Sequence, residues 1–163
     1  DLNDEDIVVI LDGDDWLAGP DVLSKLNDIY NSENCHMTYG SYVEYPSNVR
    51  GKFAKQIPDN IINENLFRES EWMSSHLRTF KFKLWKKINK DDFVYSKTEK
   101  FYKAAWDLAF VFPMLEMVGD KAKYVKDIMY VYPLNEDKIN HPIQLSEEVE
   151  IRSKIKYDRM GEY

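Results

Sequence analysis

Short apolar runs and alternating stretches along the chain predict four β-strands. Residues 7–11 (IVVIL) are apolar without interruption, which is typical of a strand buried on both faces, inside a sheet with neighbours on both sides. Residues 37–45, 74–82 and 123–132 are rich in β-formers or alternate between apolar and polar positions. These four stretches are the expected strands.

Longer stretches carry apolar residues at helical spacing. Gly19-Pro20-Asp21 is a favourable helix start, and an apolar face follows it as far as Tyr30. The longest pattern ends at Val118 and contains Pro113, which should kink the helix. The predicted helices cover residues 20–30, 63–68, 84–88, 100–118 and 146–160.

Strands that alternate with helices predict a layered α/β fold. Polar residues with Pro and Gly mark loops at 46–58 and 133–141. The length of 163 residues fits one domain, residues 1–163, with a sizeable core.

Composition narrows the class of protein. An apolar fraction of 44% excludes a disordered tail, and no stretch approaches the roughly 20 apolar residues of a membrane span. No signal segment opens the sequence, and the single cysteine, Cys35, cannot form an internal disulfide, so we expect a cytoplasmic protein. Cys35 also lacks the neighbouring ligands of a structural zinc site.

The net charge of −7 argues against nucleic acid as a partner. Residues 1–15 hold seven acids and no base, whereas residues 76–103 hold nine bases against three acids. An acidic segment beside a basic one suits a metal with an anionic ligand; two solvated faces are the alternative.

The main chemical feature is the switch from the apolar run to Asp12-Gly13-Asp14-Asp15. Clustered carboxylates repel one another, and a divalent cation would neutralise them. Carboxylate oxygens suit Mg²⁺ or Mn²⁺, which in turn hold phosphates, and open α/β sheets place ligands at strand carboxyl ends.

Three other interpretations of this cluster compete with a cation site. A calcium loop fails because Leu17 and Leu23 stand where Gly and the closing Glu should be. A plain acidic turn before the helix remains open. A haloacid-dehalogenase-like phosphatase with Asp12 as nucleophile also remains open, although Asp91-Asp92 follows a polar stretch rather than the apolar strand that this family needs.

An ordered series of segments resembles family 2 glycosyltransferases with the GT-A fold. VVILDGDDWL is similar to their strand and DXD signature, and residues 72–80 (WMSSHLRTF) to an acceptor-side segment. Ala105-Trp106-Asp107 stands where the family carries Glu-Asp, and 130–141 resembles the strand and loop that close over the diphosphate.

The resemblance implies a mixed sheet flanked by helices and an inverting transfer from a UDP-sugar to an acceptor hydroxyl of a glycan or glycoconjugate. Asp14 would bind Mn²⁺ or Mg²⁺, and Asp12 the donor. Asp107 would be the general base. Trp106 replaces the usual Glu and offers a ring for stacking on a sugar; a helix-surface aspartate is the alternative for Asp107.

His76 and Arg78 would share one strand face, His76 toward the acceptor and Arg78 toward the diphosphate, unless this is only a partly exposed edge. His141 would be a further metal ligand, although loop histidines before proline often have no such role. GT-A enzymes carry about a hundred residues before the motif, so the resemblance implies the C-terminal part of such a domain, without its N-terminal nucleotide-binding strands. A catalytically inactive sugar-binding fragment is therefore a further alternative.

Overall fold

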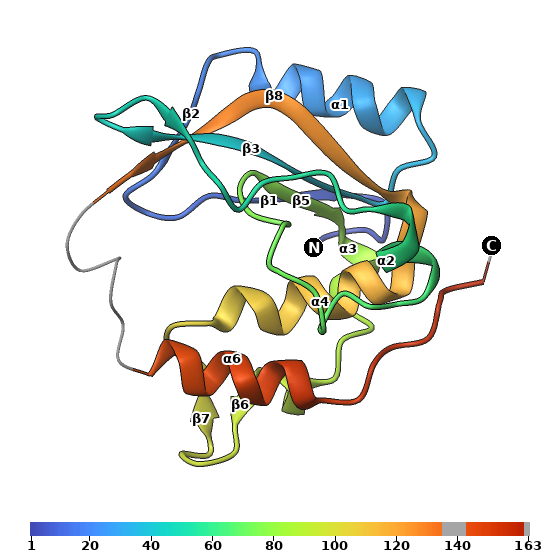
Figure 1. The fold of residues 1–163 in the computed structure, drawn as a ribbon. Helices are drawn as coiled ribbons and strands as arrows, with labels where there is room; N and C mark the ends of the chain where they lie inside the picture. Colours follow the sequence, from blue (N-terminus) through green and yellow to red (C-terminus); the bar gives the residue numbers. More distant parts are fainter. Residues whose placement is uncertain (135–142, 162–163) are drawn as a thin grey trace.

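A curled mixed β-sheet is the centre of the computed structural model, which describes residues 1–134 and 143–161 (Figure 1). Its strands lie in the order β1-β5-β3-β8-β2, with the short β4 paired to β3. Only β3 and β8 are parallel; the other pairs are antiparallel. The strands are β1 (Ile7–Ile10), β2 (Trp16–Leu17), β3 (Met37–Tyr45), β4 (Val49–Arg50), β5 (Arg78–Lys81) and β8 (Ala122–Pro133).

Helices cover both faces of this sheet. Helix α1 (Val22–Ser32) lies on one face, and α4 (Trp106–Val118) and α6 (Gln144–Ser153) lie on the other side (Figure 1). Helices α2 (Asp59–Asn63) and α3 (Phe82–Trp85) are short, and a hairpin of β6 (Val94–Tyr95) and β7 (Lys100–Phe101) lies beyond α6. The predicted class, a mixed α/β fold with a sheet flanked by helices, is confirmed.

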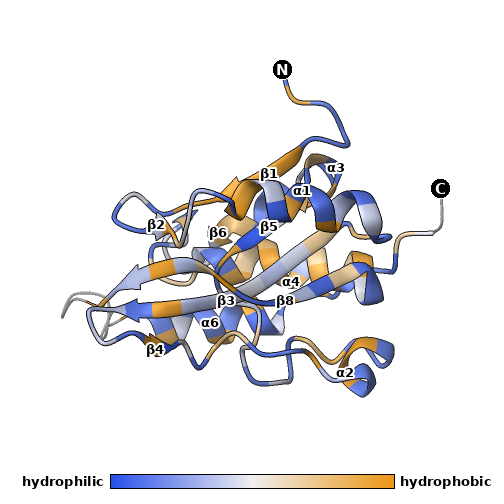
Figure 2. Cartoon of the chain, turned by 90° about the horizontal axis from the view of Figure 1, so that it is seen from above, coloured by the Kyte–Doolittle hydropathy of each residue, from blue (hydrophilic) through white to orange (hydrophobic). Residues whose placement is uncertain are grey.

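Two apolar cores lie on the two faces of the sheet, because successive strand residues point to opposite sides. On β1, Val8 and Ile10 pack on the core built around α4, whereas Val9 packs on the core that includes Val22 and Leu26 of α1. Figure 2 shows β1 as apolar along its whole length. The continuous apolar run of the sequence therefore reflects a strand that contributes to both cores.

One prediction about this strand is wrong for the described part of the chain. β1 is not interior: it lies at an edge of the sheet, pairs with β5 alone, and its four residues are half-buried. Burial from two sides can come from helices above and below, so an apolar run indicates covered faces and not paired edges.

Several element bounds also differ from the predictions. The long helix begins at Trp106, because Lys100–Phe101 pairs as β7 instead. The predicted helix at 63–68 is replaced by α2, which ends at Asn63, and Asn65 adopts a positive φ of 54° that a helix does not allow. Only residues 78–81 of the predicted strand at 74–82 form β5, and the C-terminal helix ends at Ser153.

A single buried carboxylate fixes where α4 begins. Glu147 of α6 accepts hydrogen bonds from the backbone N–H groups of Lys103, Ala104 and Ala105 at 2.8–3.2 Å. These residues directly precede Trp106, where intrahelical acceptors are lacking. Glu147 thus does from another helix what an N-cap residue ordinarily does within its own.

A buried ion pair joins α4 to the segments that wrap around it. Arg68 binds Glu116 through two hydrogen bonds, Nε–Oε1 at 2.5 Å and Nη2–Oε2 at 2.9 Å, and also donates to the Ile151 carbonyl. Glu116 further accepts the backbone N–H of Tyr157.

Within the described ranges, no helix is both long enough and apolar enough to cross a bilayer.

Candidate functional site

The acidic loop crosses the sheet because its two flanking strands lie at opposite edges. β1 and β2 are the outermost strands of the sheet path, yet only residues 11–15 separate them in sequence. The loop is tightened by a hydrogen bond from the Asp15 N–H to the Asp12 carbonyl at 3.1 Å. Its carboxylates are therefore carried past the segment that leads into the interior strand β5, where His76 lies.

His76 is held by three tyrosine rings. Its imidazole stacks on Tyr130, with ring centroids 4.5 Å apart and an interplanar angle of 11°, and on Tyr132 at 5.4 Å. Tyr42 meets it edge-on at 5.7 Å. Tyr42 and Tyr130 are direct partners in the β3–β8 register, and Tyr132 follows on the same face of β8, so strand pairing builds this aromatic cage.

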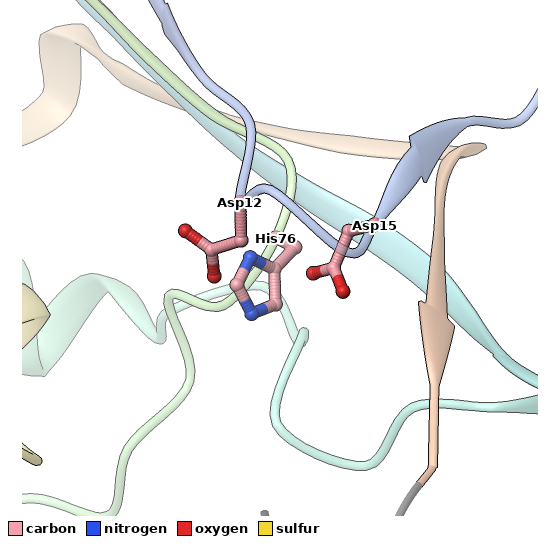
Figure 3. A group of neighbouring side chains, drawn as sticks. All are labelled: Asp12, Asp15 and His76. Atoms are coloured by element: carbon pink, nitrogen blue, oxygen red, sulfur yellow. The ribbon is translucent and has the colours of Figure 1, made fainter.

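Asp12, Asp15 and His76 converge within this cage. Each offers one ligand atom, and the three atoms lie within 4.8 Å of one another (Figure 3). The Tyr130 hydroxyl donates to Asp15 Oδ2 at 2.5 Å and accepts the Asp12 N–H at 3.3 Å. Burial raises the pKa of Tyr130, so its hydroxyl remains a proton donor toward Asp15.

The donor set of this group fits a divalent cation. Two carboxylates and an imidazole are ligands that Mn²⁺ accepts readily, and Mg²⁺ prefers the oxygens. Ligands at opposite vertices of an octahedron lie about 4.2 Å apart when metal–ligand distances are about 2.1 Å. Ligands at adjacent vertices lie about 3.0 Å apart, and at least two of the three pairs formed by these atoms must be adjacent, so the side chains would have to move closer together to bind one ion.

Arg78 links this group to Asp107. Its Nη1 donates to Asp107 Oδ2 at 2.6 Å, and its Nη2 lies 3.3 Å from His76 Nδ1. The guanidinium is 1% exposed, and its Nε has no hydrogen-bond partner among the described residues. Asp107 Oδ1 accepts the N–H of Leu108. The ion pair and the backbone therefore fix the carboxylate of Asp107, which remains partly exposed.

The structure brings together some of the site residues predicted from the sequence and not others. His76 and Arg78 are both buried and in contact, and Asp12 and Asp107 lie at the two ends of this chain of contacts. Asp14 is exposed and does not belong to the Asp12–Asp15–His76 group. Trp106 is 40% exposed beside Asp107. His141 lies outside the described residues, so its role as a metal ligand stays a prediction.

The sequence placed Asp15 in the acidic cluster but gave it no role of its own, and it did not indicate the tyrosine cage or Glu147. The alternation of Tyr130 and Tyr132 was a usable signal for two rings on one face, but nothing local placed Tyr42 opposite them. The sequence alone does not show which carboxylate of the short acidic run is a metal ligand, because this depends on the direction in which the loop turns. Glu147 is separated by 42 residues in sequence from Ala105, one of the residues whose backbone N–H it accepts.

Comparison with known proteins adds no assignment: no protein-family model matches this chain, and no curated protein matches it.

Proposed function

We propose that this chain carries the metal, acceptor and base side of a metal-dependent glycosyltransferase site that uses a UDP-sugar. The observation that carries the proposal is the convergence of Asp12, Asp15 and His76 next to the Arg78–Asp107 pair. A cation ligand set, a buried arginine and a partly exposed carboxylate are the groups needed to hold a sugar diphosphate and accept a proton from a hydroxyl. The sequence resemblance to GT-A enzymes supports the same assignment.

The residues divide this chemistry between them. A cation held by Asp12, Asp15 and His76 would supply positive charge for the departing diphosphate. The buried guanidinium of Arg78 adds fixed positive charge beside the cation site and orients the Asp107 carboxylate through their ion pair. Asp107 keeps lone pairs free of its two hydrogen bonds, so it can accept the proton of an acceptor hydroxyl.

Calorimetric titration of Mn²⁺ and UDP into the protein tests the proposal. We expect UDP to bind only with Mn²⁺ present, and Asp12→Asn to weaken Mn²⁺ at least about tenfold, because even the loss of an outer-shell partner has that effect. The pair Asp15→Asn and Asp14→Asn decides between two ligand sets. A larger loss in Asp15→Asn supports the group described above; a larger loss in Asp14→Asn supports the set predicted from the sequence, Asp14 with His141.

Asp107→Asn separates an enzyme from a binding domain. In an enzyme this variant should abolish release of UDP from a UDP-sugar while leaving UDP and Mn²⁺ affinity within about twofold, because the proposal assigns Asp107 to the acceptor hydroxyl and not to the cation or the diphosphate. Absence of any Mn²⁺-dependent UDP binding in the unsubstituted protein contradicts the proposal. If the protein instead forms a beryllium fluoride adduct that Asp12→Asn abolishes, phosphoryl transfer through Asp12 takes its place.

A further inference from the structure

An open apolar groove lies between α3, the β6–β7 hairpin and the start of α4. Its volume is about 680 Å³, which is within the range of small-molecule sites. Six apolar or aromatic residues line it: Trp85, Ile88, Phe93, Phe101, Tyr102 and Trp106. The groove is distinct from the Asp12–Asp15–His76 group, but it reaches Trp106, the residue immediately before Asp107.

The rings of this groove are unusually exposed. Phe101 is 73% exposed, and Trp85 and Trp106 each show about two fifths of their surface to solvent. Single exposed apolar side chains are ordinary on a protein surface, whereas several around one hollow mark a binding site. Trp85 is also held in place by Phe93 at 5.0 Å and Phe110 at 5.9 Å, so one wall of the groove is preformed.

The polar residues that line the groove are cationic, apart from the hydroxyl of Tyr102. They are Lys86 and Lys90, and among the described residues no carboxylate or side-chain amide lines the groove. Lys86 pairs with Asp4, but both side chains are more than half exposed, so this pair is weak and readily exchanged. Lys90 forms no ion pair with any residue that the structure describes. The groove therefore has an apolar floor with positive charge beside it, and of its two lysines only Lys86 has an ion-pair partner among the described residues.

We infer that this groove binds a single anionic amphiphile, with its hydrocarbon chain on the aromatic floor and its phosphate at Lys86 and Lys90. Charge complementarity selects an anion, and the apolar floor selects a hydrocarbon. A free sugar is disfavoured, because its hydroxyls would meet none of the carboxylates or amides that satisfy buried polar groups. This binding site does not depend on the transfer reaction proposed above.

Decyl phosphate, kept below its critical micelle concentration, is a suitable probe for calorimetry on the whole chain. We expect it to bind without any metal, and inorganic phosphate at the same concentration not to compete. Phe101→Asp should weaken binding about tenfold, because it places a charge among the apolar contacts. Leu145→Asp is the matched control, since Leu145 of α6 is also 73% exposed but does not line the groove, and this variant should leave affinity unchanged.

A second pair of variants tests the cationic side. Lys90→Glu should weaken decyl phosphate about fivefold or more, whereas Lys87→Glu, an exposed lysine that does not line the groove, should have little effect. Both variants carry the same change in net charge, so a general electrostatic effect would act equally on them. Urea unfolding of each variant shows that the fold is retained.

Four results would overturn the inference. The first is equal affinity in Phe101→Asp and Leu145→Asp, and the second is equal affinity in Lys90→Glu and Lys87→Glu. The third is binding to phosphatidylglycerol vesicles with none to monomeric decyl phosphate, which would make the groove a bilayer contact. The fourth is a dimer in sedimentation that Phe101→Asp dissociates, in a protein that does not bind decyl phosphate. Loss of Mn²⁺-dependent UDP binding has no bearing on these outcomes.

Discussion

His36 lies half-buried next to three lysines, and this position makes it a source of pH-dependent stability. Burial, together with Lys83, Lys81 and Lys121, lowers the pKa of His36 from 6.5 to about 4. The unfolded chain therefore binds a proton between pH 6.5 and 4 that the folded chain does not. Stability contributed by the neutral imidazole is present above pH 6.5 and is lost as the pH falls toward 4.

His36→Gln should flatten this dependence. We expect the free energy of unfolding of the unsubstituted protein to fall by about 1 kcal/mol more than that of His36→Gln between pH 7 and pH 5, after allowance for solvent screening of a half-buried group. Urea unfolding at the two pH values measures the difference. Parallel losses in the two proteins would show that His36 titrates alike in the folded and unfolded states.

For single residues of the candidate site, the sequence indicated several of the side chains but not the contacts between them. Asp12, His76, Arg78 and Asp107 were recognised by residue type and by order along the chain. The pairing of Arg78 with Asp107 was not, because 29 residues separate them and only the contact between β5 and the start of α4 joins them. The burial of His76 follows from rings on two other strands, which no local pattern contains.

At the level of elements, α4 depends on α6 for its first turn. Glu147→Gln replaces one of the accepting oxygens with an amide NH₂ that cannot accept the N–H groups of residues 103–105. Because a buried charge-assisted interaction is lost, we expect destabilisation of about 2 kcal/mol in urea unfolding.

Glu148→Gln is the matched control for this change. Glu148 lies on the same helix, but its ion pair with Arg152, four residues on, is partly exposed and is its only one within the described residues. Loss of this ion pair should lower the free energy of unfolding by about 0.5 kcal/mol. Equal effects of the two substitutions would contradict the capping role of Glu147.

Element prediction succeeded where burial follows a periodic pattern and failed where tertiary contacts end an element. Helix α1 and strands β3 and β8 were placed to within about two residues, because each has apolar residues at a regular spacing. The start of α4 depends on the β6–β7 hairpin and on Glu147, and the end of α6 on residues after Ser153 that extend along α4. Such contacts leave no periodic signal.

Across the whole molecule, the Arg68–Glu116 pair joins three distant segments. Both side chains are fully buried, so removing one partner leaves an uncompensated charge. Glu116→Gln should cost about 3 kcal/mol in urea unfolding, whereas the double variant Arg68→Met, Glu116→Leu should recover part of that loss, because an apolar pair leaves no buried charge. Glu71→Gln, which breaks the exposed Lys55–Glu71 pair, should cost at most about 0.5 kcal/mol.

A double variant less stable than Glu116→Gln would show that the hydrogen bonds to Ile151 and Tyr157 matter more than the buried charge.

The parallel pairing of β3 with β8 also shapes how the chain reaches its native state. These neighbouring central strands join residues 37–45 to residues 122–133, so the middle of the sheet is closed by a contact of very high sequence separation. Contacts of this kind slow folding, because a long loop must be ordered before they form. During synthesis β2 and β3, which both pair with β8, must therefore wait for β8 to emerge from the ribosome. Until then those strands are exposed to pairing with other chains, and chaperones that hold nascent chains should raise the yield of folded protein.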